Sequence, residues 1–323
     1  MLRRTFVAAG VAALCALAGP ALAQKFPDRA ITIVVPYGPG GTNDIVAREV
    51  AQKMQEQFGQ PVVVENKPGA NGALGTGFVA RAKPDGYTIG IAPSSVLAIN
   101  EWLYKDLPYD VEKDLQPLSL AGTTPNILVV HPSVPANTIA EFVALAKSKP
   151  GGIAYASMGA GSTGHLNGEL FKTLTGTDIK HIPYKGSGPA LNDLLAGQVQ
   201  AMFDNLSTAL THVKAGKLKG LGITSLERSP LAPEIPTVAA TVKGFDATSW
   251  FGFVAPKGMP QPVLDALAAA IIKAMNAPDV RERLEKGGLT VVANKPEEFG
   301  AFIRAEKAKW GGVVKAANVK IEQ

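Results

Sequence analysis

The strongest constraint on the fold of this chain is a pattern of strand, glycine-rich turn and helix that occurs twice. The β-rich run Ile31–Val35 leads into a turn with three glycines (36–41), after which apolar residues recur at four-residue steps. The run 153–157 leads into a second glycine turn (159–164) and a leucine stripe. Strands that alternate with helices in this way form parallel sheets. The sequence therefore predicts an α/β fold.

Two such units predict two lobes of similar construction. The second unit starts near a strand at 126–130, and Thr138 with Glu141 predicts a capping box at the start of a helix. Later in this unit, Pro189 is expected to open a helix that Gly197 closes. The C-terminal part is mainly helical and is expected to return to the first lobe. The predicted division is residues 24–123 with 226–323 for the first lobe and 124–225 for the second.

The N-terminus has the pattern of a secretory signal peptide over residues 1–23. Arg3 and Arg4 precede an uncharged apolar run, and 21–23 (ALA) supplies a small–x–small cleavage site. The run is shorter than the about 20 residues that cross a bilayer, which disfavours the alternative of a membrane anchor. The paired arginines leave twin-arginine export open. Since the only cysteine is Cys15, the exported, periplasmic chain would form no disulfide and no thiolate site.

The first glycine turn is suited to an anionic ligand. Gly40 and Gly41 let the backbone approach a ligand closely, and the first N–H groups of the following helix have no partners within the helix. These donors and the helix dipole favour a carboxylate or a phosphate. We therefore expect Gly40, Gly41, Thr42 and Asn43 to contact the ligand. Asp44 either faces the ligand site or completes the cap of the helix.

The second glycine turn allows three interpretations. Gly159, Gly161 and Gly164 match a dinucleotide fingerprint, but the next strand does not end in an acidic residue. Ser162 lies in a sequence like a nucleophile elbow, which would need a histidine and a carboxylate from elsewhere in the fold. His165, three residues away on the same turn, is poorly placed to act as that base. The third interpretation is a second anion-binding turn.

Other polar residues are weaker candidates. Asn71 either contacts ligand or fills a left-handed turn position, and Ser94 and Ser95 end a strand at the edge of the sheet where ligands of α/β proteins bind. Lys185 is either a countercharge or a solvated surface lysine. Asp204 with Asn205 either receives a ligand amine or hydroxyl, or caps a helix.

Composition excludes several classes of function. The four histidines are scattered without the spacing of a metal site, so we predict no metal and no cofactor. The net charge is +5, or +3 without Arg3 and Arg4, and the aromatic residues form no stripe with basic neighbours. We therefore predict no binding to nucleic acid.

Stretches spread in order over the whole exported chain resemble the Bug family (TctC-like), the extracytoplasmic solute receptors of tripartite tricarboxylate transporters. The matching stretches are 33–41 (IVVPYGPGG), 65–70 (ENKPGA), 84–87 (PDGY), 155–157 (YAS), 161–162 (GS) with His165 and Leu166, 183–186 (PYKG), 203–205 (FDN) and 249–252 (SWFG).

This resemblance implies a type II periplasmic-binding-protein fold, in which two α/β lobes close a cleft on the ligand. It also implies that a ligand carboxylate lies between the two glycine turns, held by main-chain groups and bridging waters. By position, the residues that carry over are Tyr37, Gly40, Gly41, Thr42, Asn43, Ser157, Gly161, Ser162 and Thr163. We count His165 among the ligand-binding candidates as well.

The predicted function is a periplasmic receptor, monomeric and not an enzyme, for a small organic carboxylate. It would deliver the ligand to the integral membrane subunits of a tripartite tricarboxylate transporter. A sensory module that presents its ligand to a signalling receptor would have the same sequence features. A serine hydrolase that uses Ser162 is the third hypothesis.

Overall fold

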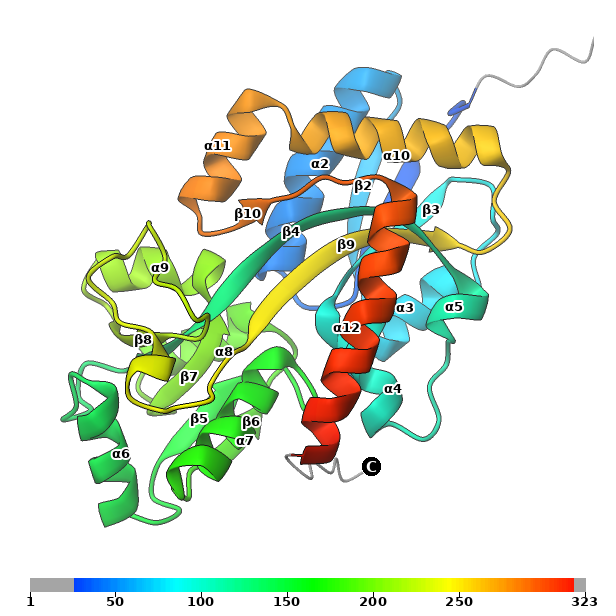
Figure 1. The fold of residues 1–323 in the computed structure, drawn as a ribbon. Helices are drawn as coiled ribbons and strands as arrows, with labels where there is room; N and C mark the ends of the chain where they lie inside the picture. The colour runs from blue at the N-terminus through cyan, green and yellow to red at the C-terminus, as the bar shows by residue number, and fades with distance from the viewer. Residues whose placement is uncertain (1–25, 317–323) are drawn as a thin grey trace, which may run out of the picture.

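The computed structural model describes residues 26–316, which form two α/β lobes around one sheet of ten strands (Figure 1). The strand order is β2-β1-β3-β9-β4-β7-β5-β6, and β8 and β10 also pair with β4. The predicted α/β class is confirmed. The strands are β1 (Ile31–Val35), β2 (Val62–Asn66), β3 (Thr88–Pro93), β4 (Leu115–Val130), β5 (Ala154–Ser157), β6 (Lys180–Pro183), β7 (Ala201–Asn205), β8 (Lys219–Ile223), β9 (Thr248–Pro256) and β10 (Thr290–Val291).

The helices follow the predicted alternation with the strands. They are α2 (Thr42–Phe58), α3 (Ala73–Ala80), α4 (Asn100–Leu103), α5 (Val111–Asp114), α6 (Ile139–Ser148), α7 (Thr163–Thr175), α8 (Ser187–Leu195), α9 (Leu206–Lys214), α10 (Gln261–Met275), α11 (Pro278–Lys286) and α12 (Pro296–Ala316), with the short turns η1 (Ala70–Gly72), η2 (Ser95–Ile99) and η3 (Val238–Ala240). The signal peptide predicted for residues 1–23 lies outside the described residues. Within those residues no helix is both long enough and apolar enough to cross a bilayer.

Two local predictions need correction. Thr138 caps α6 as expected, because its hydroxyl accepts a bond from the Glu141 N–H at 3.1 Å. The Glu141 carboxylate, however, accepts from the N–H of Asn137 at 2.6 Å and not from that of Thr138. The second bond of the capping box therefore goes to the residue before the N-cap residue. Helix α8 begins at Ser187 and not at Pro189, since Gly186 already serves as its N-cap.

Strand β4 belongs to both lobes. Its residues 115–125 pair with β9, whereas residues 126–130 pair with β7 and β8. The predicted strand at 126–130 is therefore only the second-lobe end of a strand of 16 residues. The change of partner lies two residues beyond the predicted lobe boundary, and we keep the predicted division as a proposal with its boundary moved to 125/126.

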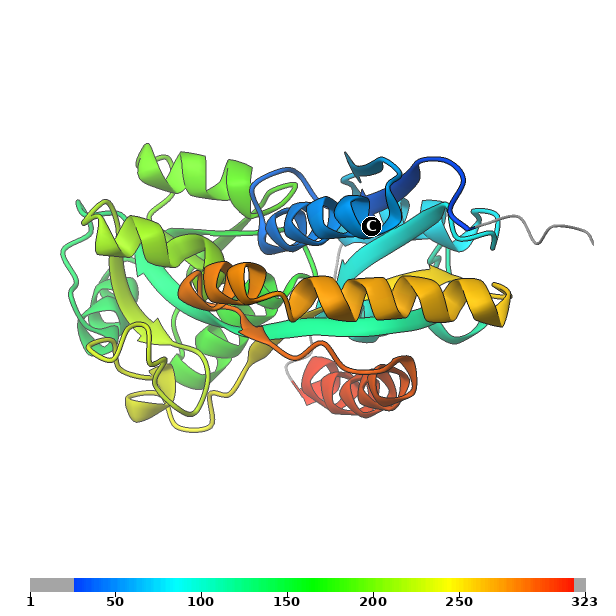
Figure 2. The same cartoon turned by 90° about the horizontal axis from the view of Figure 1, so that it is seen from above.

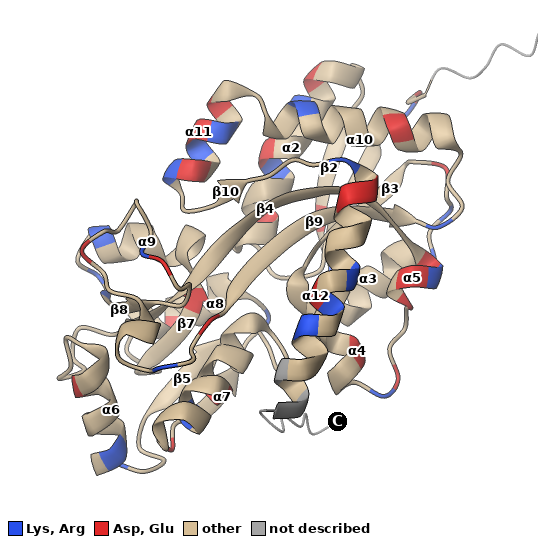
Figure 3. Cartoon of the chain, in the orientation of Figure 1, with Lys and Arg blue, Asp and Glu red and all other residues tan. Residues whose placement is uncertain are grey.

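The C-terminal helices pack on the first lobe, as predicted. Helix α10 contacts α2 on one side of the sheet, and α12 contacts η2 and β4 on the other (Figure 2). Their apolar residues complete two buried clusters that include β1, β3 and β9. Gly252 of β9 allows the closest approach, because a Cβ atom there would lie 2.0 Å from the Phe299 ring of α12. Charged residues of both signs are spread over the outer helices, including α11 and α12 (Figure 3).

Candidate ligand-binding site

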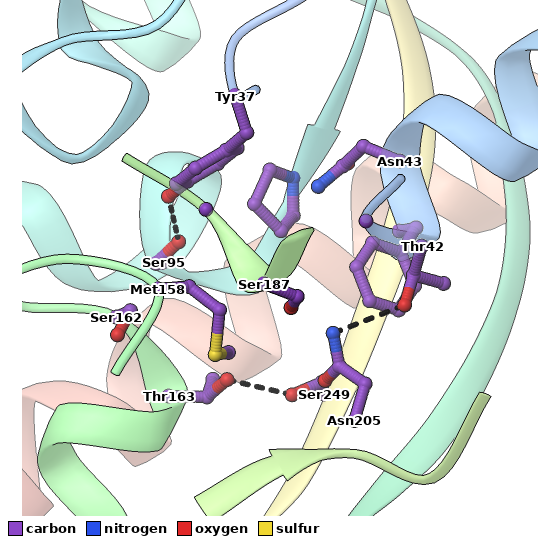
Figure 4. A pocket seen from close by; sticks show the side chains of 14 residues that line it. Tyr37, Thr42, Asn43, Ser95, Met158, Ser162, Thr163, Ser187, Asn205 and Ser249 are labelled. Atoms are coloured by element: carbon purple, nitrogen blue, oxygen red, sulfur yellow. Dashed lines mark hydrogen bonds between the residues drawn. The ribbon is translucent and has the colours of Figure 1, made fainter. Parts of the chain in front are cut away.

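A cavity lies where the two lobes meet, with about 360 Å³ of space between atoms, part of it open to solvent. Fourteen residues line it (Figure 4). Eight of them are candidates from the sequence, namely Tyr37, Gly41, Thr42, Asn43, Ser95, Ser162, Thr163 and Asn205. None of the fourteen has a charged side chain, so the cavity walls contain no lysine or arginine to bind an anion.

Four helices begin at this cavity. The residues that precede or open them, Gly41 at α2, Ser162 at α7, Gly186 at α8 and Asn205 at α9, all line it. Each helix follows a strand, so the cavity lies at the carboxyl ends of β1, β5, β6 and β7, where open α/β sheets bind ligands. The sequence folds this way because glycines and polar caps end each strand and start each helix.

The first N–H groups of three of these helices are not capped by side chains. Gly41, Gly186 and Asn205 make no side-chain bond to the first turn of α2, α8 or α9. Such N–H groups carry partial positive charge and need an acceptor. These N–H groups polarise the cavity to receive an anion, although no lining residue has a cationic side chain. Asn43, which is 7% exposed and lines the cavity, has a side-chain oxygen without a partner among the described residues, and this oxygen can accept a hydrogen bond from a ligand.

The two lobes touch across the cavity. The Gly38 N–H donates to the Lys185 carbonyl oxygen at 2.9 Å, and the Tyr104 hydroxyl donates to the Ala160 carbonyl oxygen at 2.9 Å. Asn205 also donates from its side chain to the Thr42 hydroxyl at 3.1 Å. These hydrogen bonds connect the first lobe to the second across the cavity.

In the first glycine turn, Gly40 and Asp44 do not line the cavity. The Asp44 carboxylate accepts bonds from the Gly40 N–H at 3.1 Å, from Arg48 Nε at 2.9 Å and from Asn66 Nδ2 at 3.0 Å. Burial acts to raise the pKa of Asp44, but these hydrogen bonds, above all that from Arg48, lower it below its usual value. Asp44 therefore stabilises the turn from behind the cavity wall, which favours the second of its two expected roles, at the start of the helix.

In the second turn, Ser157, Gly161 and His165 lie behind the cavity wall. Ser157 Oγ is 2.7 Å from His181 Nε2, and His165 Nδ1 accepts a bond from the Gly161 N–H at 3.0 Å. The two imidazole rings stack with their centroids 4.0 Å apart. Burial lowers the pKa of His165 to about 4 and that of His181 to about 3, so both rings are neutral at pH 7. This buried network supports the turn and does not contact the cavity.

The remaining four candidates also lie outside the lining. Asn71 adopts the left-handed conformation (φ 47°) and accepts a bond from the Tyr37 hydroxyl at 2.8 Å. Ser94 is fully buried, and its hydroxyl has no partner among the described residues. Lys185 contributes its main-chain oxygen to the contact with Gly38. Asp204 lies behind Ser187, whose hydroxyl donates to it at 2.7 Å.

Six lining residues were not among the candidates from the sequence. They are Pro93, Met158, Gly186, Ser187, Ser249 and Phe251. The stretch 186–188 (GSG) begins three residues after Pro183, the last residue of β6, so it repeats the strand–glycine–helix pattern and was a usable signal. Ser249 and Phe251 lie in β9 and within the family stretch 249–252, which does not by itself indicate that they reach the cavity.

The hydrolase hypothesis finds no support in this geometry. The Ser162 hydroxyl accepts a bond from the His165 N–H at 3.3 Å and so caps α7. The His165 Nδ1 atom accepts a bond from the Gly161 N–H. The serine–imidazole pairs among residues 26–316 are Ser157 with His181, which is partly buried, and Ser133 with His131, which is exposed, and neither of them contains Ser162. Within residues 26–316 there is also no group of three or more His, Cys, Asp or Glu placed to hold a metal ion.

Comparison with known proteins agrees with the resemblance noted in the sequence. The family model described as tripartite tricarboxylate transporter family receptor (TctC) matches residues 46–319. Protein BugT of Bordetella pertussis is 39% identical over 312 residues, which cover 96% of each chain.

Two solved structures share the fold closely. An R. palustris protein solved with adipate is 34% identical, with a TM-score of 0.88 over 91% of this chain and 99% of that one. MatC from Rhodopseudomonas palustris, solved with bound malate, is 34% identical, with a TM-score of 0.85 over 90% of this chain and 100% of that one. The predicted periplasmic-binding-protein fold is thereby confirmed. The chain belongs to the tripartite tricarboxylate transporter receptor (TctC) family, whose members include the Bug proteins.

Proposed function

We propose that this protein is a periplasmic receptor that binds a small organic carboxylate in the cavity between its lobes. The observation that carries the proposal is the meeting of four helix N-termini at one cavity that contains no cationic side chain. Main-chain N–H groups can satisfy a carboxylate fully, and the helix dipoles add about 0.3–1 kcal/mol each. Relatives solved with adipate and with malate support an organic acid as the ligand.

We further propose that closure of the lobes forms the surface that a tripartite tricarboxylate transporter recognises. The hydrogen bonds between Gly38 and Lys185 and between Tyr104 and Ala160 join the lobes only when the cleft is shut. A ligand that contacts both lobes stabilises this arrangement over an open one. Residues 1–23, as a cleaved signal peptide, would direct the chain to the periplasm. The receptor acts as a monomer and catalyses no reaction in this proposal.

A thermal-shift screen of the chain without residues 1–23 tests ligand binding. Mono-, di- and tricarboxylates, amino acids and aromatic acids form the panel, and a true ligand at 100 times its Kd should add about 2.7 kcal/mol to the free energy of unfolding. Gly41→Leu should abolish the shift, because its side chain would enter the cavity from an extended backbone position (φ −85°) that accepts any residue.

The matched control for this screen is Gly312→Leu, at an exposed position in α12 where an added Cβ meets no atom within 4 Å. The control should keep the shift of the unsubstituted protein. A panel in which no acid raises the melting temperature would contradict the proposed function. Uptake of the identified acid by cells that lack the receptor then separates transport from the sensory alternative, since only a transport receptor is needed for uptake.

A further inference from the structure

Asp204 is a buried carboxylate that forms no ion pair with any cation among residues 26–316. It is 0% exposed and accepts hydrogen bonds from Ser187 Oγ at 2.7 Å and from Thr208 Oγ1 at 2.6 Å. Burial raises its pKa to about 6, and the groups that lower it again are hydrogen-bond donors and not charges. A buried charge of this kind is costly unless something compensates it. Its neighbour Ser187 lines the cavity, so the compensating group can come from the ligand.

Ser187 faces the cavity as a hydrogen-bond acceptor. A serine hydroxyl has one hydrogen and two lone pairs, and the Ser187 hydrogen is engaged by the Asp204 carboxylate, which can only accept. The lone pairs of Ser187 Oγ are therefore what remains for a ligand. The negative charge of Asp204 behind this oxygen strengthens its preference for a donor.

Four other hydroxyls around the cavity, those of Tyr37, Ser95, Thr163 and Ser249, also have their hydrogens engaged. Ser249 donates to Asn126 Oδ1 at 2.8 Å, so Thr163, whose hydroxyl is 2.7 Å from that of Ser249, must be the donor in that pair. Tyr37 donates to the side-chain oxygen of Asn71 at 2.8 Å, so Ser95, 3.0 Å away, must donate to Tyr37. Every one of these hydroxyl hydrogens is used inside the protein.

Ser162 differs from them. Its oxygen accepts from the His165 N–H, and no hydrogen bond among residues 26–316 uses its hydrogen. Together with the uncapped N–H groups of α2, it belongs to a donor side of the cavity. The acceptor Ser187 lies next to that side, since a Cβ atom at Gly41 would be 3.9 Å from Ser187 Cβ. One small ligand can therefore contact both the donors, which are Ser162 and the N–H groups of α2, and the acceptor Ser187.

We propose that the cavity selects a carboxylate that carries a hydrogen-bond donor, a hydroxyl or an ammonium, on the carbon next to the carboxylate, and that Ser187 backed by Asp204 receives this donor. The inference rests on the proposed function, because it assumes that the helix N-termini hold the carboxylate. A second carboxylate at the same position would meet acceptor oxygens and a buried negative charge. Sites built to pair with a ligand OH or NH group reject analogues that lack it.

Five acids that differ only at carbon 2 test the proposal by calorimetry at pH 8. They are butanoate, 2-methylbutanoate, 2-hydroxybutanoate, 2-aminobutanoate and ethylmalonate, in which the group is hydrogen, methyl, hydroxyl, ammonium and carboxylate. We expect the hydroxy and amino acids to bind at least about tenfold more tightly than the other three. Ser187→Ala should remove most of this difference, and Asp204→Asn should remove the preference for ammonium over methyl.

Two further variants serve as controls. Thr208→Val removes the other hydroxyl bond to Asp204 without changing the cavity lining and should keep the selectivity. Ser162→Ala should weaken all five acids by a similar factor. If Asp204→Asn fails to fold, the effect of Ser187→Ala on the selectivity tests the proposal by itself.

The outcomes separate the inference from the proposed function. If butanoate or ethylmalonate binds as tightly as the hydroxy and amino acids, or if Ser187→Ala keeps the full difference, the inference is wrong while carboxylate binding stands. If none of the five binds although the wider panel has given a ligand, the inference is wrong as well. If no acid of either set binds, the proposed function itself fails.

Discussion

Replacing Gly188 with alanine should weaken ligand binding about ten- to a hundredfold with little change in the free energy of unfolding. Gly188 lies in the first turn of α8, and a Cβ atom there would be 2.4 Å from the main-chain oxygen of Pro39 in the opposite lobe. Backbone on the far side of the cleft cannot move aside as a flexible side chain can. Steric overlap of this kind costs about 1–3 kcal/mol, which here falls on the closed state alone and lowers the apparent affinity accordingly.

Titration of the identified ligand into Gly188→Ala measures this effect, and a urea unfolding curve measures stability. Gly38→Ala approaches the same contact from the first lobe, where a Cβ would lie 2.9 Å from the Lys185 oxygen, and should act in the same direction. Gly312→Ala is the matched control in open space. Unaltered affinity in Gly188→Ala, or a loss of affinity matched by a loss of stability, would show that closure does not depend on this contact.

The second large effect is expected from acid. His165 and His181 have folded-state pKa values lowered by burial to about 4 and about 3, against 6.5 for an ordinary histidine. Below pH 6.5 these two histidines therefore bind protons in the unfolded chain but not in the folded protein. The free energy of unfolding that is present above pH 6.5 is lost as the pH falls toward 4. With about 1.4 kcal/mol for each unit of pKa difference, the loss between pH 6.5 and 4.5 is on the order of several kcal/mol.

Asp204 opposes this trend only in part. Its folded-state pKa of about 6 lies above the usual 3.8, so it alone would favour the folded state as the pH falls through that window. Urea unfolding at pH 7.5, 6, 5 and 4.5 measures the sum. His181→Gln, which removes one of the two buried rings, should reduce the slope markedly. A free energy of unfolding that stays constant down to pH 4.5 would contradict the assignment of two neutral buried rings.

Local sequence patterns predicted those parts of the site that lie within one turn. Gly41 to Asn43 and Ser162 with Thr163 line the cavity because a glycine turn fixes the start of its own helix. The same reasoning could not place Asp44. Whether that side chain faces the ligand or turns back depends on Arg48, one helical turn later, and on Asn66 in the next strand.

Contacts that depend on the meeting of the two lobes could not be predicted from the sequence. Ser249 comes to Thr163 from 86 residues away in the chain, and Asn205 to Thr42 from 163 residues away. Ser157 and His165 lie in stretches that match the family, and ligand contact was predicted for both on the basis of sequence. A motif shows that residues occur together but not where their side chains point. The packing of their side chains against His181 shows that they support the turn from behind.

The continuity of β4 has a consequence for how the protein unfolds. Residues 115–125 of this strand are hydrogen-bonded to β9, and residues 126–130 to β7 and β8. Neither lobe can lose its structure without depriving the other of a central strand. The two halves should therefore melt together as one cooperative unit, although their cores on the second lobe and around α10 are largely separate. The chain also crosses between the lobes a second time, from β8 to β9, which pairs with β4. Two adjacent connections of this kind favour bending and twisting of the lobes over sliding.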